Sequence, residues 1–169
     1  MAHAKASGRP VIASAEPGER WLYCYFDDAM VELLREVTRI MKENEKRVRD
    51  FYEAIVPGHR ERVASLQSAH VVYELPEGMP TGGGRFEGVA VRDEFLPKFY
   101  GAYDVRLVPE EFITSGKHVT VVGRLVGKTR DGGVPVNVPF VHVWTVRSDI
   151  LTRMRVFTDT ALLAKALGQ

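Results

Sequence analysis

The sequence predicts an α+β fold in which helices occupy the first half of the chain and an antiparallel sheet the second half. Apolar residues recur at helical spacing over 29–55, whereas the chain after Tyr103 alternates strand-like runs with short turns. Sequential strands joined by tight turns form an antiparallel meander. Separation of helices from strands along a chain is typical of a sheet whose helices cover one face.

The bulk composition bounds the class of protein. A chain of 169 residues is enough for one compact domain, and its 23 basic and 22 acidic residues give a net charge of +1. Such a balance offers no broad field for nucleic acid or an anionic membrane. The single cysteine, Cys24, cannot form an internal disulfide, and no Cys/His cluster has metal-site spacing. We therefore expect a cytoplasmic protein without metal or cofactor that binds neither nucleic acid nor membrane.

The sequence of residues 1–26 predicts an N-terminal arm rather than a packed helix or strand. Residues 1–19 are rich in Ala, Gly and Pro and lack periodicity, which is typical of disordered or loosely attached segments. The dense apolar patch Trp21–Phe26 is expected to pack on the domain or on a second subunit. After this arm we expect a single domain over 27–169.

Three helices are expected before the meander. Asp27 and Asp28 supply N-cap and first-turn acids for the first of them. Because the pattern turns polar all round after Lys42, this segment is either one long helix or two helices with a break near 42–44. Pro97 is expected to kink or shorten the third helix. The predicted helices span 29–55, ending at Pro57-Gly58, then 59–67 and 89–100.

A first strand and a glycine-rich connection separate the second and third helices. The strand, 71–75, is stopped by Pro76, and the connection that follows contains three consecutive glycines, Gly82–Gly84. These glycines predict a plain loop, because no Lys-Ser/Thr pair follows them as a phosphate-binding motif requires. The strands of the later meander are expected at 105–113, 119–128, 134–147 and 151–158.

The strand 138–146 is apolar on both faces. One face would carry Phe140, His142, Trp144 and Val146, and the other Val141, Val143 and Thr145. Such a strand is covered on both sides. We therefore expect a curved sheet with a core or pocket on its concave face and a partner surface on its convex face.

The order of these elements resembles the SnoaL-like branch of the nuclear transport factor 2 and ketosteroid isomerase superfamily. The resemblance extends over 42–168, and residues 1–40 lie outside it. Its most specific pieces are FYEAI (51–55), VVYELP (71–76), RFEGVAVRDEF (85–95), PFVHVWTV (139–146) and RVFTDT (155–160).

The resemblance implies a cone, formed by a strongly curved, mostly antiparallel sheet wrapped around three N-terminal helices. An additional arm and helix would precede it. The family further implies a homodimer through the convex sheet face and a cofactor-free protein that binds an apolar or weakly polar small molecule. That protein would be an acid/base isomerase, cyclase or hydratase. The alternative is a non-catalytic ligand-binding or dimerisation module of the same fold.

Ketosteroid isomerase chemistry is not expected. An ungapped comparison places the catalytic base of those enzymes at Leu75, their tyrosine at Phe51 and their acidic donor at Val141. None of these residues can take the corresponding role. The Arg and Asp set of epoxide-hydrolase-like members also has no convincing match.

The SnoaL-like cyclases imply another pair, Asp159 late in the last strand and His142 on the neighbouring strand, as acid and base. Each residue has a second interpretation. Asp159 precedes a helical run and would serve as its N-cap. His142 enters the pocket only if the face that it shares with Trp144 is concave, whereas the ungapped comparison makes it an interface histidine on the convex side. Ligand contacts are expected from Tyr73, Leu75, Phe95, Phe99, Val141, Val143, Trp144, Met154 and Val156.

Overall fold

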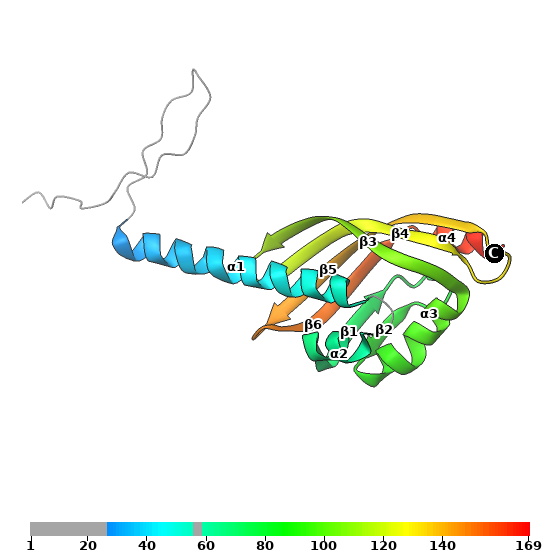
Figure 1. Cartoon of the computed structure of the whole chain (residues 1–169), viewed down its shortest axis with the longest axis horizontal. Helices are drawn as coiled ribbons and strands as arrows, with labels where there is room; N and C mark the ends of the chain where they lie inside the picture. The colour runs from blue at the N-terminus through cyan, green and yellow to red at the C-terminus, as the bar shows by residue number, and fades with distance from the viewer. Residues whose placement is uncertain (1–26, 56–58) are drawn as a thin grey trace, which may run out of the picture. The chain divides into compact units, whose positions relative to one another are not determined.

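The computed structural model describes residues 27–55 and 59–169 (Figure 1). Contacts divide the chain into two compact units, Met1–Ile40 and Met41–Gln169. This division falls beside Lys42, where the resemblance to the SnoaL-like branch begins.

Some predictions fall outside the described residues. These are the arm over 1–26 with its apolar patch Trp21–Phe26, Cys24, and the helix stop at Pro57-Gly58. The predicted boundary between arm and domain after residue 26 therefore stays a prediction. No helix in the described part of the chain combines the length and apolar character needed to cross a membrane.

The first helix, α1, runs without interruption from Asp28 to Ala54. Asp27 caps it, because its carboxylate accepts a 2.8 Å hydrogen bond from a backbone N–H of the first turn. The polar stretch after Lys42 stays helical, since charged side chains pair along the helix, as Lys46 does with Asp50 at 2.8 Å. One long helix is thus the correct alternative, and the break near 42–44 is wrong.

The remaining helices are short. The predicted helix over 89–100 consists of a π-helical turn, η1 (Val91–Phe95), followed by α3 (Leu96–Ala102). Pro97 lies in the first turn of α3, where its missing N–H needs no partner. Proline therefore begins this helix rather than kinking it. The other two helices are α2 (Arg60–Leu66) and α4 (Thr160–Ala166).

Among the described residues, six strands form one sheet in the order β2-β1-β6-β5-β4-β3. All neighbours are antiparallel except β1 and β6, which run parallel. The α+β prediction with a mostly antiparallel sheet is confirmed, although the four-residue strand β2 was not foreseen. The strands are β1 (Gln67–Leu75), β2 (Gly84–Glu87), β3 (Tyr103–Ser115), β4 (His118–Thr129), β5 (Pro135–Arg147) and β6 (Ile150–Thr158).

Glycines in β4 allow the sheet to bend. A Cβ added to Gly123 would meet the carbonyl oxygen of Val108, and one added to Gly127 would meet that of Asp104. Next to Gly123, which pairs with Pro109, the pairing of β3 with β4 shifts between Pro109 and Glu111. Strand glycines and bulges are the usual causes of local sheet curvature.

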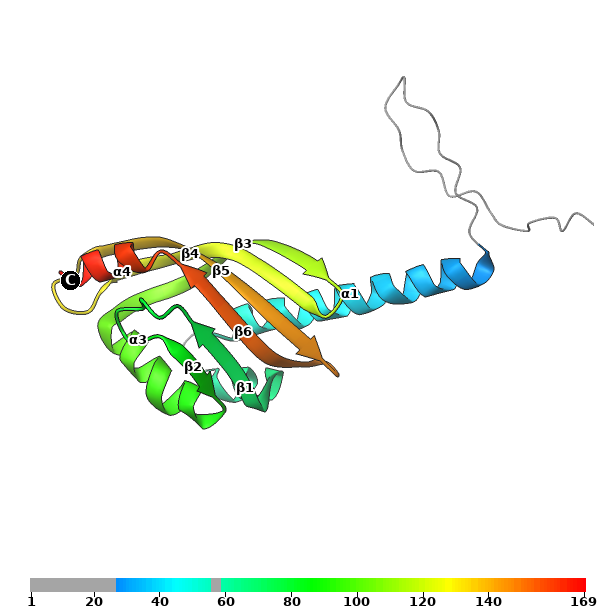
Figure 2. The ribbon, with the colours of Figure 1, turned by 180° about the vertical axis from the view of Figure 1, so that it is seen from behind.

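The inner face of the sheet is the one that packs against the second part of α1. Along β5 burial alternates strictly from Val136 to Trp144, as a half-covered strand requires. The ring of Phe51 on α1 lies 4.5 Å, centroid to centroid, from that of Trp144 on β5. Seen from behind, β1 and β2 extend the sheet past β6, with α3 beside them (Figure 2).

Candidate functional site

His142 is a polar side chain within the apolar interior. It lies on the inner face of β5, only 5% exposed, and its Nδ1 is 2.7 Å from the hydroxyl oxygen of Tyr52 on α1. The imidazole stacks on Phe140, with ring centroids 4.2 Å apart. A polar group in such surroundings is informative because buried side chains of this kind need a partner.

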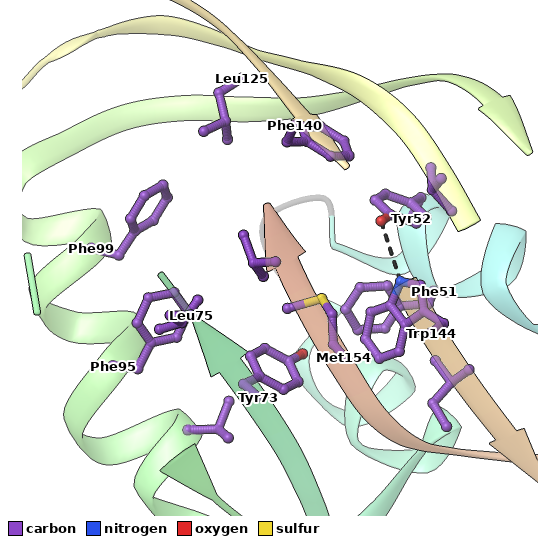
Figure 3. Packing of buried hydrophobic residues seen from close by; sticks show 14 of the residues in the cluster. Phe51, Tyr52, Tyr73, Leu75, Phe95, Phe99, Leu125, Phe140, Trp144 and Met154 are labelled. Carbon is purple, nitrogen blue, oxygen red and sulfur yellow. Dashed lines mark hydrogen bonds between the residues drawn. The ribbon is translucent and has the colours of Figure 1, made fainter. Parts of the chain in front are cut away.

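Trp144 fixes the direction of this hydrogen-bond chain. Its Nε1–H donates to the hydroxyl oxygen of Tyr52 over 3.3 Å, the contact drawn as a dashed line in Figure 3. Indole can only donate, so Tyr52 accepts from Trp144 and its own proton is free to point at Nδ1 of His142. This arrangement assigns the imidazole proton to Nε2.

Burial favours the uncharged form of both groups. Desolvation lowers the pKa of His142 from 6.5 to about 3. Desolvation also raises the pKa of Tyr52, against a smaller opposite effect of the hydrogen bond from Trp144. A neutral imidazole with so low a pKa is a weak base, but its Nε2–H remains a good hydrogen-bond donor.

Nε2 of His142 has no hydrogen-bond partner among the described residues. Within that part of the chain, the buried side-chain polar atom left without a partner is Oγ1 of Thr81. Nε2 of His142 does not belong to this group, so the described residues leave a small part of its surface uncovered. It forms the end of the Trp144–Tyr52–His142 chain.

A second polar pair lies on the other side of Trp144. Nε2 of Gln67 is 2.5 Å from the hydroxyl oxygen of Tyr73, whose pKa is raised by burial. The ring of Tyr73 meets Trp144 edge to face at 5.9 Å and Phe95 at 6.2 Å between centroids. Tyr73, one of the predicted ligand contacts, thus belongs to the same interior as His142.

Most predicted ligand contacts meet on this inner face. They come from β1, η1, α3, β5 and β6 and are all buried in one cluster, part of which is shown in Figure 3. These residues are Tyr73, Leu75, Phe95, Phe99, Trp144, Met154 and Val156. Their contact with a ligand stays a prediction.

Val141 and Val143 require a correction. They lie on the outer face of β5, half-buried, because side chains of a strand alternate between faces. One surface of β5 cannot present them together with Trp144. The ungapped comparison placed His142 on the convex side, and this is wrong, because the face that carries His142 points inward.

Asp159 lies at the surface, at the start of α4. Its Oδ1 accepts a 3.0 Å hydrogen bond from the backbone N–H of Leu162, so the capping interpretation is confirmed. His142 pairs across the hairpin with Val156, three positions before Asp159, roughly 10 Å along the strand. No hydrogen bond joins Asp159 to His142 among the described residues, and their joint catalytic role stays a prediction. Among these residues no Asp or Glu is buried.

Two residues of this site were not singled out from the sequence, Tyr52 and Gln67. Tyr52 lies within the apolar spacing that predicted a helix over 29–55, and no role was predicted for its hydroxyl. A signal was nevertheless present, since a tyrosine on the buried stripe of a helix needs a partner for its hydroxyl. The described residues contain no group of three or more His, Cys, Asp or Glu side chains that could hold a metal ion.

Comparison with known proteins places this arrangement in context. The family model of the SnoaL-like domain matches residues 48–154. An NTF2-like protein of unknown function from Burkholderia pseudomallei K96243 is 28% identical, with a TM-score of 0.69 over 75% of this chain and 98% of its own. The structure of TerC co-crystallised with polyporic acid is 30% identical, with a TM-score of 0.67 over 75% of this chain and 99% of TerC.

A more distant neighbour shares the fold. A candidate SnoaL-like polyketide cyclase from Jannaschia sp. CCS1 is 23% identical, with a TM-score of 0.62 over 75% of this chain and 92% of its own. A search of curated proteins found no match.

Proposed function

Because the chain belongs to the SnoaL-like domain family, we propose that it binds an apolar or weakly polar small molecule on the inner face of the sheet. An oxygen atom of this molecule accepts a hydrogen bond from Nε2 of His142. The observation that carries the proposal is the buried chain Trp144–Tyr52–His142, which holds the imidazole in one tautomer within a mostly apolar interior.

The aromatic surroundings favour a flat, oxygen-bearing ligand. Phe51, Tyr73, Phe95 and Trp144 contact one another edge to face around the same interior. Apolar walls with a few placed polar groups are the usual composition of small-molecule sites. TerC, 30% identical to this chain, was co-crystallised with polyporic acid, which makes this compound a rational first probe.

Acid/base catalysis is the second candidate function. A neutral imidazole held by a tyrosine can stabilise the negative charge that develops on a carbonyl oxygen when a neighbouring carbon loses a proton. Isomerisation and cyclisation both pass through such a step. The described interior supplies this donor but no buried carboxylate as base. Binding is therefore the better-supported function, and Asp159 remains the sequence-based candidate for the base.

The outer face of the sheet supports a further part of the proposal, a homodimer. Val122, Val141 and Phe157 lie side by side on neighbouring strands of this face, and Phe157 is 52% exposed. An apolar row on a sheet face is typical of a protein interface. We infer that a second copy covers it, and that the protein works in the cytoplasm.

Binding of polyporic acid tests the proposal. The chain has two tryptophans, so the variant Trp21→Phe leaves Trp144 as its sole indole fluorophore. We expect polyporic acid to quench this fluorescence saturably, because the ligand would lie beside the Trp144–Tyr52–His142 chain. In the same background, His142→Leu should weaken binding by roughly tenfold, the value of one hydrogen bond of about 1.4 kcal/mol.

Asp159→Asn is the matched control, since it removes a charge at the surface and keeps a capping side chain. Its affinity should equal that of the parent protein. Circular dichroism of each variant verifies that the fold is retained. Absence of quenching, or equal affinity of the His142→Leu variant, would contradict a site at His142.

A further inference from the structure

The first four turns of α1 carry an exposed apolar face. Its members are spaced three or four positions apart and therefore share one side of the helix. They are large side chains, each between 41% and 57% exposed. We call this face the α1 stripe; it consists of Met30, Leu33, Leu34, Val37 and Ile40.

The two arginines of this segment each contact a glutamate within the helix. Arg35 lies 3.5 Å from Glu32, and Arg39 lies 2.6 Å from Glu36. The stripe itself carries no charge. Monomeric proteins rarely expose a contiguous apolar face of large side chains to water, so the stripe indicates an interaction surface.

The stripe has the spacing of a two-helix seam. Met30 and Val37 occupy one heptad position, Leu33 and Ile40 occupy the other core position, and Leu34 flanks them. Apolar residues at these two positions are what a helix needs to pack its side chains between those of a second helix.

The charges of the segment favour an antiparallel partner of the same kind. Residues 27–33 contain three carboxylates and no basic residue, whereas 34–40 contain two arginines and one glutamate. Parallel pairing would bring two acidic starts together. Antiparallel pairing places each acidic start beside the other copy's arginines and opposes the two helix dipoles.

We propose that the α1 stripe is the surface through which two copies of this chain pair, with their α1 helices antiparallel. In the register centred on Arg35, Met30 lies opposite the partner's Ile40 and Leu33 lies opposite the partner's Val37. Leu34 then lies near the partner's Leu34, so every member of the stripe is covered.

A lipid surface suits the segment less well. Helices that lie on membranes present a polar face rich in Lys and Arg. Here the first turns carry Asp27, Asp28 and Glu32, which anionic headgroups would repel. A second copy of the chain satisfies both the apolar stripe and its charge pattern.

The molar mass of the full-length protein in solution tests the proposal. Val37→Glu places a carboxylate in the stripe, and Thr38→Glu places one on the next residue, outside it. Both side chains are exposed, and Thr38 otherwise bonds only to the carbonyl of Leu34 in its own helix. Sedimentation equilibrium should give Val37→Glu half the mass of the wild type, while Thr38→Glu keeps the wild-type mass.

The same measurement separates this interface from the one proposed on the outer sheet face. If both interfaces form, the wild type is a tetramer, and Val37→Glu and Phe157→Glu each reduce it to a different dimer. Combining the two substitutions then gives a monomer. Loss of mass with Phe157→Glu alone supports only the sheet interface and overturns the pairing through α1.

Spin labels test the orientation. In a Cys24→Ser background, single cysteines replace Asp28 and Lys42, which lie opposite each other in the proposed register. A mixture of the two labelled proteins should give shorter distances than either protein alone, because like labels are offset by about 21 Å along the helix axis. The reverse order indicates parallel helices and overturns the antiparallel pairing. A monomeric wild type also overturns the pairing, whether or not the monomer sediments with phosphatidylglycerol vesicles.

Discussion

Tyr52 on α1 and His142 on β5, which are 90 positions apart in the sequence, share a buried hydrogen bond of 2.7 Å. Tyr52 also accepts the indole N–H of Trp144, two positions further along the same strand. The helix thereby fixes the tautomer of a strand histidine. An apolar interior gains one oriented donor, the Nε2–H of His142.

The stability of the protein should depend on pH through His142. Its pKa is 6.5 when unperturbed and is lowered to about 3 by burial, so between these values the unfolded chain binds a proton that the folded chain does not. The free energy of unfolding should therefore fall as the pH drops below 6.5. We expect this residue to account for about 2 kcal/mol between pH 7 and pH 5. Urea denaturation at both pH values measures the loss, and His142→Gln should show a smaller one. Equal losses would argue against a neutral buried imidazole.

Tyr52→Phe should destabilise the fold. The substitution leaves the indole N–H of Trp144 and Nδ1 of His142 without their partner, at a cost of about 1–3 kcal/mol. Tyr100→Phe is the control, because the half-buried hydroxyl of Tyr100 has no hydrogen-bond partner among the described residues. It should change the free energy of unfolding by less than about 0.5 kcal/mol. Similar effects of the two substitutions in urea denaturation would refute the importance of the chain.

Asp159 should act through the start of α4. Asp159→Ala removes the acceptor of the 3.0 Å bond from Leu162 and should lower the free energy of unfolding by about 1 kcal/mol. Asp159→Asn preserves an acceptor and should cost only a few tenths. Thermal denaturation compares them. An Asn variant as unstable as the Ala variant would show that the charge, rather than the cap, stabilises this end.

The curvature of the sheet should depend on Gly123. A Cβ at this position would meet the backbone of β3, so Gly123→Ala should cost more than about 2 kcal/mol. Gly101→Ala in α3 is the matched control, since its Cβ would meet no atom within 4 Å. That change should stabilise the helix by about 0.5–1 kcal/mol. Chemical denaturation distinguishes the two, and a tolerated Gly123→Ala would contradict the close approach of the strands.

Phe157→Glu should separate a dimer that forms through the outer sheet face. Phe157 is 52% exposed, so the substitution places a carboxylate in the apolar row without disturbing the interior. Val89→Glu is the control, because Val89 is an exposed apolar residue away from this face. Light scattering after size-exclusion chromatography should show a lower mass for Phe157→Glu alone. An unchanged mass for both variants would remove the proposed sheet interface.

The spacing of apolar residues and turns in the sequence was sufficient to predict most of the fold. Apolar spacing predicted a helix over 29–55, and strand-like runs separated by short turns predicted the meander after Tyr103. The last of these turns contains Ser148 and Asp149, which adopt positive φ, at 47° and 58°, as a tight hairpin turn requires. The sequence did not predict the short strand β2, because four residues flanked by glycines are too few to show an alternating apolar pattern. The sequence did not decide between one helix and two in this region, because ion pairing, rather than apolar spacing, supports the helix over 42–47.

The sequence pattern alone did not predict which face of β5 points inward. Strand geometry determined that His142 shares a side with Trp144 and opposes Val141. Apolar residues occupy both sides, however, so hydrophobicity gave no preference. The packing of Phe51 from α1 onto Trp144 decided the question. Comparison without gaps failed here because a shift of one residue exchanges the two faces of a strand.

Local spacing in the sequence thus determined the elements, their order and the N-cap at Asp159, since each depends on residues a few positions apart. Only the tertiary structure decided that Tyr52, His142 and Trp144 form one hydrogen-bonded chain and that Asp159 stays apart from it. The physical reason is that a buried polar group finds its partner through strand register and the packing of the second part of α1 on the sheet. Neither is encoded in the neighbourhood of the residues themselves.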